Sequence, residues 1–168
     1  MDERLIDPTL THNRTIVERK SDLEMVVTRT FDAPAHIMFE AWTKAELFRQ
    51  WWVPKSFGLT VLACEMDVRV GGRYRLEFGH PASEQPMSFY GSYLEVVPDA
   101  RIVWTNEESE DGAVTTVTFE EQNGKTLLAI SNRFPSKEAL ESELASGATD
   151  GMGQTLDQLE TFIVTLVK

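Results

Sequence analysis

The sequence predicts an α+β fold, in which a curved antiparallel sheet of six to seven strands wraps around a long C-terminal helix, with two short helices after the first strand. Three observations support this prediction. Apolar and polar residues alternate in successive runs between residues 60 and 134, as they do in half-buried strands. Residues 150–166 have the spacing of an amphipathic helix. Residues 41–54 hold three of the four tryptophans and predict short helices that close one end of the sheet.

The bulk composition is that of one globular domain. The chain has 168 residues, 42% of them hydrophobic and 26% charged, and no apolar run approaches the roughly 20 residues that cross a bilayer. The formal net charge of -11 argues against nucleic acid as a partner, because phosphate binding needs clustered cations. The acidic N-terminus lacks an apolar signal core, and Cys64 is the single cysteine, so we expect a cytoplasmic protein with a buried structural thiol.

The N-terminal part predicts an arm followed by one domain. Residues 1–12 are polar and aperiodic, so we expect a flexible arm, and residues 13–168 make up the domain. Residues 13–31 have the composition of a strand with one polar break. Asp32 and Pro34 then supply a helix-start signal, because the acid can accept backbone N–H bonds and the proline suits the first turn.

Two short helices are expected next. The first has one apolar face, formed by Ile37, Met38, Ala41 and Trp42. Thr43 has the position of an N-cap for a second helix that ends near Gln50. Trp51 and Trp52 then precede Pro54 and cannot both face one side of a regular element. We therefore expect one indole in the core and the other over a groove.

Turn signals separate the later strands. Gly71-Gly72 predicts the tight turn of a hairpin, Gly91 predicts a bulge or bend within a strand, and Asn123-Gly124 predicts a second hairpin. Short turns between strands of this kind indicate an antiparallel meander.

The C-terminal part is predicted to be helical again. Ser136 is expected to cap a short helix that extends to Leu144. The longer helix that follows places Asp157 and Glu160 outside and has an apolar face made of Met152, Leu156, Leu159, Ile163 and Leu166. A long helix after a meander is expected to lie in the concave face of the sheet.

No group of residues predicts a catalytic centre, a cofactor site or a metal site. His12, His36 and His80 are isolated, and Gly71-Gly72 lacks the lysine and following helix of a phosphate-binding loop. No nucleophile elbow of the Gly-x-Ser-x-Gly type occurs. General acid–base chemistry in a cavity stays open, with these polar candidates: Glu40, Arg75, Tyr90, Tyr93, Asn106 and Arg133.

A set of motifs between residues 23 and 168 supports a family resemblance. The motifs are Arg29-Thr30-Phe31-Asp32-Ala33-Pro34, Ala41-Trp42-Thr43, Trp51-Trp52-x-Pro54, Asp67-x-Arg69-x-Gly71-Gly72, Gly91-x-Tyr93-x-Glu95-Val96 and the C-terminal amphipathic helix. With these motifs the chain resembles the bacterial single-domain proteins related to the C-terminal domain of the activator of the heat-shock protein ninety ATPase. That family belongs to the START-like (SRPBCC) superfamily, which includes polyketide cyclases and lipid-transfer domains.

The resemblance implies a helix-grip fold with a cavity for an apolar ligand between the sheet and the C-terminal helix. Two positions depart from the family pattern. Val53 stands where relatives usually have glycine, so the loop is expected to be stiffer. Met152 stands where an aromatic residue often follows Gly151, which would widen or reshape the pocket mouth. The activator's separate N-terminal domain has no counterpart before Leu23, which argues against chaperone activation.

We therefore expect the domain to bind a small hydrophobic, ring-containing molecule or lipid in this cavity, without defined catalysis. The expected pocket residues are Trp52, Phe57, Phe78, Tyr93, Trp104, Met152 and Leu156. Two alternatives stay open: a cyclase- or hydratase-type enzyme that uses a cavity acid or tyrosine, and an interaction module that modulates a chaperone ATPase in a stress response. We expect no membrane partner, and the edge strands of the sheet leave a homodimer open.

Overall fold

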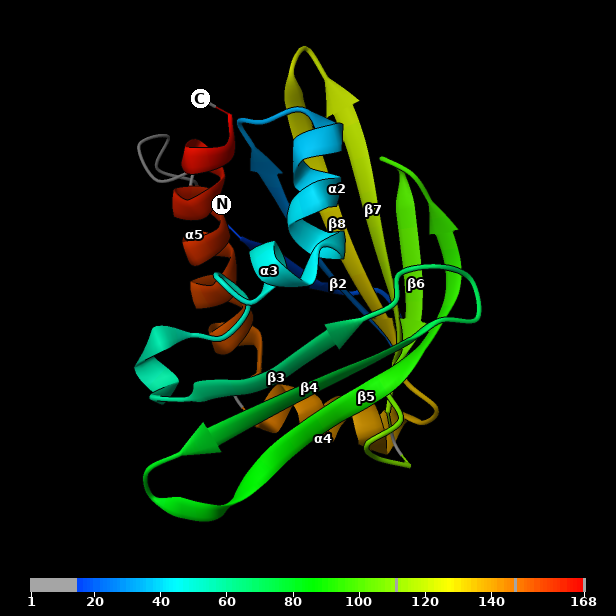
Figure 1. The fold of residues 1–168 in the computed structure, drawn as a ribbon. Helices are drawn as coiled ribbons and strands as arrows, with labels where there is room; N and C mark the ends of the chain where they lie inside the picture. Colours follow the sequence, from blue (N-terminus) through cyan, green and yellow to red (C-terminus); the bar gives the residue numbers. More distant parts are fainter. Residues whose placement is uncertain (1–14, 111, 147, 168) are drawn as a thin grey trace.

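A single curved sheet of eight antiparallel strands dominates the computed structural model, which describes residues 15–110, 112–146 and 148–167 (Figure 1). The strand order is β1-β2-β8-β7-β6-β5-β4-β3. The strands are β1 (Ile16–Arg19), β2 (Glu24–Phe31), β3 (Thr60–Met66), β4 (Arg73–His80), β5 (Ser83–Val97), β6 (Arg101–Thr105), β7 (Val114–Gln122) and β8 (Lys125–Arg133). This arrangement confirms the predicted fold class.

The helices lie on the inner side and at both ends of the sheet (Figure 1). They are α2 (Ala35–Thr43), α3 (Ala45–Phe48), the 3-10 helix η1 (Lys55–Phe57), α4 (Lys137–Ala145) and α5 (Ala148–Leu166). Helix α5 lies beside α2, whereas α4 lies at the opposite end of the molecule from α2 (Figure 1). The segment from α2 to η1 therefore spans the open side of the sheet.

Strand β1 is the one strand beyond the predicted six to seven. The polar break in the N-terminal strand region is a tight turn, in which the Ser21 hydroxyl accepts hydrogen bonds from the backbone N–H groups of Leu23 and Glu24, each at 3.1 Å. β1 turns back along β2, with Ile16 opposite Thr28. The two short helices consequently follow the second strand rather than the first. The predicted arm, residues 1–12, lies outside the described residues.

Two of the three predicted helix caps are wrong. Pro34 is the N-cap of α2, and the backbone N–H of Ala35 donates to Glu121 on β7 at 2.8 Å, so a distant strand supplies the acceptor that Asp32 was expected to provide. Helix α3 begins one residue later than expected, since Lys44 is its N-cap and the Thr43 hydroxyl donates back into α2. The third cap is confirmed, because the Ser136 hydroxyl accepts from the N–H of Ala139 at 3.1 Å.

The predicted turns differ in how well they match the structure. Asn123 and Gly124 both adopt positive φ, at 57° and 80°, which confirms the two-residue hairpin between β7 and β8. The connection between β3 and β4 spans residues 67–72, so the glycine pair there ends a longer loop and does not form a tight turn by itself. Gly91 marks a close backbone approach, because any side chain there would collide with the carbonyl oxygen of Thr105.

The main hydrophobic core lies between α2, α5 and the inner face of the sheet. Leu156, Leu159 and Ile163 of α5 are at most 2% exposed and share this core with inward residues of β2 and β8. Trp51 is completely buried, and its indole N–H donates to the carbonyl oxygen of Ala41 at 3.1 Å. This placement confirms that one indole of the tryptophan pair belongs to the core. A smaller apolar cluster lies under α4.

A buried cation joins α5 to the sheet. The Arg29 side chain on β2 is 1% exposed, and its guanidinium donates to Asp157 at 2.6 Å and to Glu160 at 2.8 Å. The two acids were predicted to lie outside. Asp157 is indeed mostly exposed, but Glu160 is only 32% exposed, because both side chains reach around the helix to the arginine.

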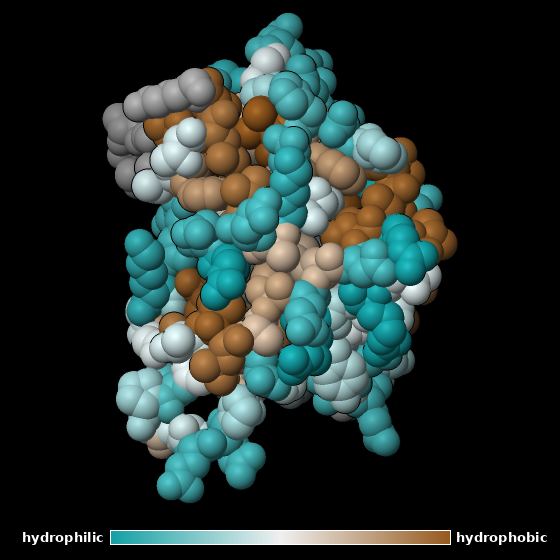
Figure 2. All heavy atoms as spheres, in the orientation of Figure 1, coloured by the Kyte–Doolittle hydropathy of each residue, from teal (hydrophilic) through white to brown (hydrophobic). Residues whose placement is uncertain are grey.

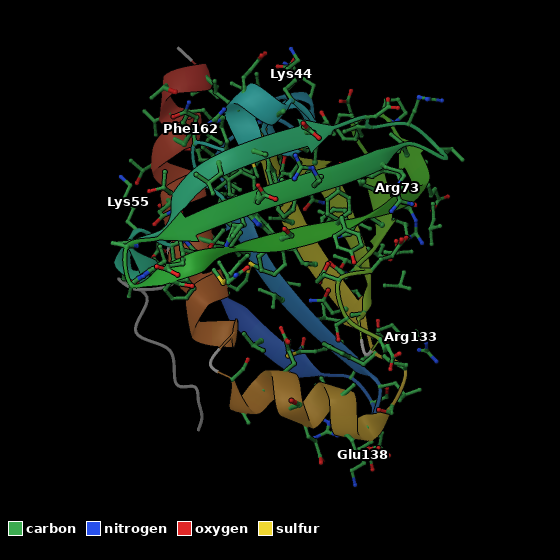
Figure 3. All side chains as sticks on the ribbon, turned by 60° about the horizontal axis from the view of Figure 1, so that its bottom comes forward. Lys44, Lys55, Arg73, Arg133, Glu138 and Phe162 are labelled. Carbon is green, nitrogen blue, oxygen red and sulfur yellow. The ribbon has the colours of Figure 1, made fainter. Side chains whose placement is uncertain are left out.

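The face of the molecule drawn in Figure 2 is predominantly hydrophilic. Figure 2 shows hydrophobic residues on one face as separate patches among hydrophilic side chains. Lys44, Arg73, Arg133 and Glu138 extend from the outside of their elements (Figure 3). Figure 3 also shows that Arg133 lies near α4, away from the strands β3, β4 and β5. None of the helices in the described parts of the chain is long and apolar enough to cross a membrane.

Candidate ligand-binding cavity

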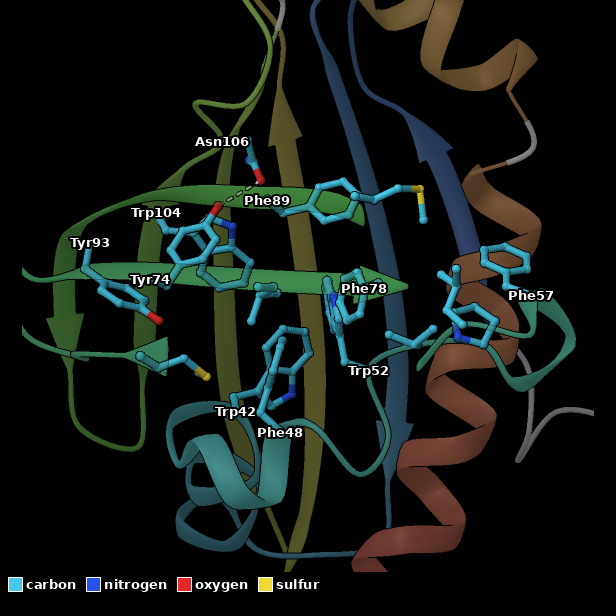
Figure 4. Close-up of a pocket in the computed structure, with 16 residues that line it drawn as sticks. Trp42, Phe48, Trp52, Phe57, Tyr74, Phe78, Phe89, Tyr93, Trp104 and Asn106 are labelled. Atoms are coloured by element: carbon cyan, nitrogen blue, oxygen red, sulfur yellow. Dashed lines mark hydrogen bonds between the residues drawn. The ribbon is translucent and has the colours of Figure 1, made fainter. Parts of the chain in front are cut away.

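A cavity of about 430 Å³ lies between the strands β3 to β6 and the segment from α2 to η1 (Figure 4). This volume is within the range of typical small-molecule sites, about 300–1,000 Å³. The described lining residues are Trp42, Phe48, Trp52, Val53, Pro54, Phe57, Leu59, Met66, Tyr74, Leu76, Phe78, Met87, Phe89, Tyr93, Trp104 and Asn106.

The strand period explains how the sheet forms its side of the wall. Alternate residues of a strand face the same side, so Tyr74, Leu76 and Phe78 of β4 all point inward. The antiparallel register places Phe89 of β5 opposite Leu76, and it places Gly91 opposite Tyr74. The missing side chain at Gly91 allows the Tyr74 hydroxyl to reach the main chain of β6.

The opposite wall is a loop held by polar side chains of α5. Gln158 donates from its amide nitrogen to the carbonyl oxygens of Trp51 and Val53, at 2.9 and 2.8 Å, and accepts from the N–H of Lys55 at 2.8 Å. Thr155 donates to the carbonyl oxygen of Trp52 at 2.9 Å. These bonds fix the backbone that presents Trp52 to the cavity.

Phe57 covers the end of the cavity next to α5. The residue is 49% exposed, and its ring lies so close to Gly151 that an added Cβ there would be 3.1 Å from the ring. Gln154 holds the same short helix by accepting from the backbone N–H and the hydroxyl of Ser56, at 3.0 and 2.8 Å. The absence of a side chain at Gly151 is therefore what allows Phe57 to lie against α5.

Five of the seven expected pocket residues line the cavity, and two do not. Trp52, Phe57, Phe78, Tyr93 and Trp104 are in its wall. Leu156 is completely buried in the core and Met152 packs against that core, and neither is among the lining residues. The physical reason is that the loop bonded to α5 lies between the helix and the cavity. The pocket thus borders this loop rather than the apolar face of α5, which corrects the predicted position directly beneath the helix.

Several lining residues were left out of the expected pocket. Trp42 was assigned to the core, and it is 2% exposed while also contributing to the wall. Tyr74 and Leu76 alternate with Phe78 on one strand face, so the strand period could have identified them. Phe48 had no comparable signal, because its position depends on how α3 packs against the sheet.

The acid–base candidates are divided between the cavity and the surface. Tyr93 and Asn106 line the cavity. Arg75 lies on the other face of β4, paired with Glu65 and Glu77 at 3.3 and 2.9 Å. The remaining candidates are not among the lining residues: Glu40 pairs with Lys44, Tyr90 is 38% exposed and Arg133 is exposed.

The titratable groups of the cavity favour their neutral forms. Burial is the main cause that raises the pKa of the Tyr74 hydroxyl, with the nearby carboxylates Glu107 and Glu108 adding to the effect. Burial likewise raises the pKa of Tyr93. Among the described residues, no lining side chain is an acid, a lysine, an arginine or a histidine. The described part of the cavity wall is therefore uncharged near neutral pH.

Metal and thiol chemistry find no support in the described residues. No group of three or more His, Cys, Asp or Glu side chains there is placed to hold a metal ion, and His12 lies outside the described part of the chain. The Cys64 thiol donates to the carbonyl oxygen of Ala45 at 3.6 Å, and burial raises its pKa. This raised pKa is the opposite of what a reactive thiolate requires.

The fold agrees with comparisons to known proteins. The family model for the activator of Hsp90 ATPase homolog 1-like proteins matches residues 32–163, and the chain belongs to this family. The family resemblance drawn from the sequence motifs is thereby confirmed.

Solved bacterial structures share the fold. A protein from Rhodobacter sphaeroides aligns with a TM-score of 0.83 at 19% identity, covering 91% of this chain and 99% of that one. A protein from Staphylococcus epidermidis aligns with a TM-score of 0.76 at 28% identity, covering 90% and 95%. An AHSA1-like protein from Aeromonas hydrophila aligns with a TM-score of 0.67 at 17% identity, covering 84% and 94%. A search of curated proteins finds no match.

Proposed function

We propose that this protein binds an uncharged, predominantly apolar small molecule that contains at least one ring, in the cavity between β3–β6 and the α2–η1 segment. The family fold commonly accommodates hydrophobic ligands, and the cavity supplies the specific argument. The observation that supports the proposal most directly is the combination of about 430 Å³ of space with a wall that is largely aromatic and carries no charged side chain among the described residues.

The aromatic wall favours ring-containing ligands over other apolar molecules. Nine of the sixteen described lining residues are aromatic, and they come from both the sheet and the opposite loop. Aromatic faces and edges pair with flat rings in stacked or edge-to-face geometries, which contribute about 0.5–1.5 kcal/mol each beyond burial. A charged ligand would lose its hydration without gaining a partner of opposite charge.

The same wall favours binding over acid–base catalysis. A general base needs a pKa near the working pH, whereas burial moves the pKa of Tyr74 and Tyr93 further above it. Asn106 does not titrate, and no carboxylate or histidine is among the described lining residues. A cyclase or hydratase of the kind considered from the sequence would find no proton-transfer group of suitable pKa among the described lining residues.

Titration with the neutral fluorophore N-phenylnaphthylamine tests the proposal. We expect saturable fluorescence enhancement with wild-type protein at one site, and affinity about tenfold weaker for Trp52→Ala, because a partly buried indole leaves the wall. Leu94→Ala is the matched control, since Leu94 is 51% exposed and not among the lining residues, so its affinity should equal that of wild type.

Two results would count against binding in this cavity. One is the absence of saturable enhancement with folded wild-type protein. The other is equal weakening by the cavity variant and the surface variant, which would indicate adsorption to exposed apolar side chains.

A further inference from the structure

At one end of the cavity, two acceptor oxygens compete for the single hydrogen atom of one hydroxyl group. There the Tyr74 hydroxyl lies 2.7 Å from the carbonyl oxygen of Thr105 and 3.3 Å from the side-chain oxygen Oδ1 of Asn106 (Figure 4). Asn106 and Tyr74 both line the cavity. The opposite end, near Phe57, is apolar (Figure 4).

The orientation of the Asn106 amide follows from its other neighbours. Its nitrogen Nδ2 donates to the carbonyl oxygen of Ala113 at 2.7 Å and to the hydroxyl of Thr115 at 2.9 Å. A carbonyl oxygen only accepts, so the nitrogen must face Ala113. The Thr115 hydroxyl donates its own proton to Asn132 at 2.7 Å, so it is free to accept from Asn106. The amide oxygen therefore faces Tyr74.

A proton count shows what this arrangement lacks. Tyr74 carries one hydroxyl proton, and the carbonyl oxygen of Thr105 is the nearer of its two acceptors. If the proton goes to Thr105, the amide oxygen of Asn106 has no donor among the described residues. If the proton goes to Asn106, Tyr74 makes no bond to Thr105. In either case the cavity end retains acceptor capacity that water or a ligand must satisfy.

We propose that Asn106 Oδ1 and the Tyr74 oxygen form an acceptor pair that recognises a hydrogen-bond donor on the ligand. The ligand would be an uncharged aromatic molecule with a hydroxyl or N–H group at one end, held by this pair, and with an apolar end toward Phe57. This inference rests on the proposed binding function and adds a polarity and an orientation to it.

A matched pair of probes tests donor recognition. β-Naphthol and its methyl ether share the ring system and the oxygen, but only the naphthol has a proton to donate. Isothermal titration calorimetry with wild-type protein should give about tenfold tighter binding for the naphthol, because the ether leaves the acceptor pair buried and without a donor. The preference in wild type needs no variant, so it can be measured even if changes at Asn106 impair folding.

Two variants test whether the preference for β-naphthol over its methyl ether depends on Asn106. Asn106→Leu should bring the two probe affinities to within about twofold of each other, because the amide oxygen is gone. Phe89→Leu is the matched control: Phe89 lines the cavity but carries no polar atom, so both affinities should fall together and their ratio should stay at the wild-type value. A crystal structure with bound β-naphthol should place its oxygen within hydrogen-bond distance of Asn106 Oδ1.

The outcomes separate the two proposals. If neither probe binds, the proposed binding function fails, and donor recognition fails with it. If both bind with equal affinity, or the ether binds more tightly, donor recognition is overturned while binding stands. A persistent preference in folded Asn106→Leu would also overturn the assignment to Asn106.

Discussion

The ion pairs of Arg29 predict an asymmetric response to mutation. The arginine side chain is 1% exposed, whereas the side chains of Asp157 and Glu160 are 63% and 32% exposed. Removing the acids strands a cation in the interior, but removing the arginine leaves two carboxylates that can turn toward water. The order of the two effects follows from this difference in burial.

The expected magnitudes are far enough apart to measure. Asp157→Ala/Glu160→Ala should lower the free energy of unfolding by about 3–5 kcal/mol, the usual cost of a buried charge left without a partner. Arg29→Met should lower it by less than about 1 kcal/mol, because methionine fills much of the same space and no buried charge is left. The change to methionine also removes the arginine Nε, which is buried and has no hydrogen-bond partner in the described structure.

Urea unfolding followed by tryptophan fluorescence gives both values. Glu141→Ala is the control, because the Glu141–Arg19 pair is 3.5 Å apart with side chains 50% and 35% exposed, so its loss should cost less than about 1 kcal/mol. If Arg29→Met proves as destabilising as the double variant, the argument from burial is refuted, and the net attraction of the ion pairs holds α5 in place.

Three further predictions concern the loop, the tyrosines and the thiol. Gln158→Ala should lower the free energy of unfolding, measured by urea unfolding, by about 1–3 kcal/mol, because the carbonyl oxygens of Trp51 and Val53 lose their donor. Gln154→Ala is the control and should show a smaller loss, because the hydrogen bonds of Gln154 are exposed. Burial raises the pKa of Tyr93 above the ordinary 10.0, so the unfolded chain releases this proton first. The free energy of unfolding should therefore fall as pH rises above about 10, with a shallower slope in Tyr93→Phe, and an unchanged slope would contradict the burial argument. Burial also raises the pKa of the Cys64 thiol, so iodoacetamide should alkylate it more slowly in the folded protein than in urea; equal rates would contradict this.

Features encoded by neighbouring residues were predicted well from the sequence. The Asn123-Gly124 hairpin, the Ser136 cap and the apolar face of α5 all match the structure. Each depends on interactions within a few residues, such as positive φ in a tight turn, a hydroxyl that reaches an N–H three residues on, or helical spacing. The overall fold class followed from the same local periods taken in order.

Features that join distant segments were missed or misplaced. The acceptor at the start of α2 comes from Glu121, and the partners of Asp157 and Glu160 come from β2, so no local signal identified them. Leu156 was expected in the pocket because it lies on the apolar face of α5. It lies in the core instead, since a loop held by Gln158 separates the helix from the cavity.

The sequence by itself determined the class of fold, most of its elements and the abundance of aromatic side chains available for a pocket. Hydrophobic period and turn chemistry are properties of short segments, and they need no knowledge of how those segments pack. The tertiary structure decided which aromatic residues border empty space, that their wall carries no charge among the described residues, and that an acceptor pair ends the cavity. Those properties depend on contacts between side chains that are far apart in the sequence. Such contacts form only when the sheet packs around the helices.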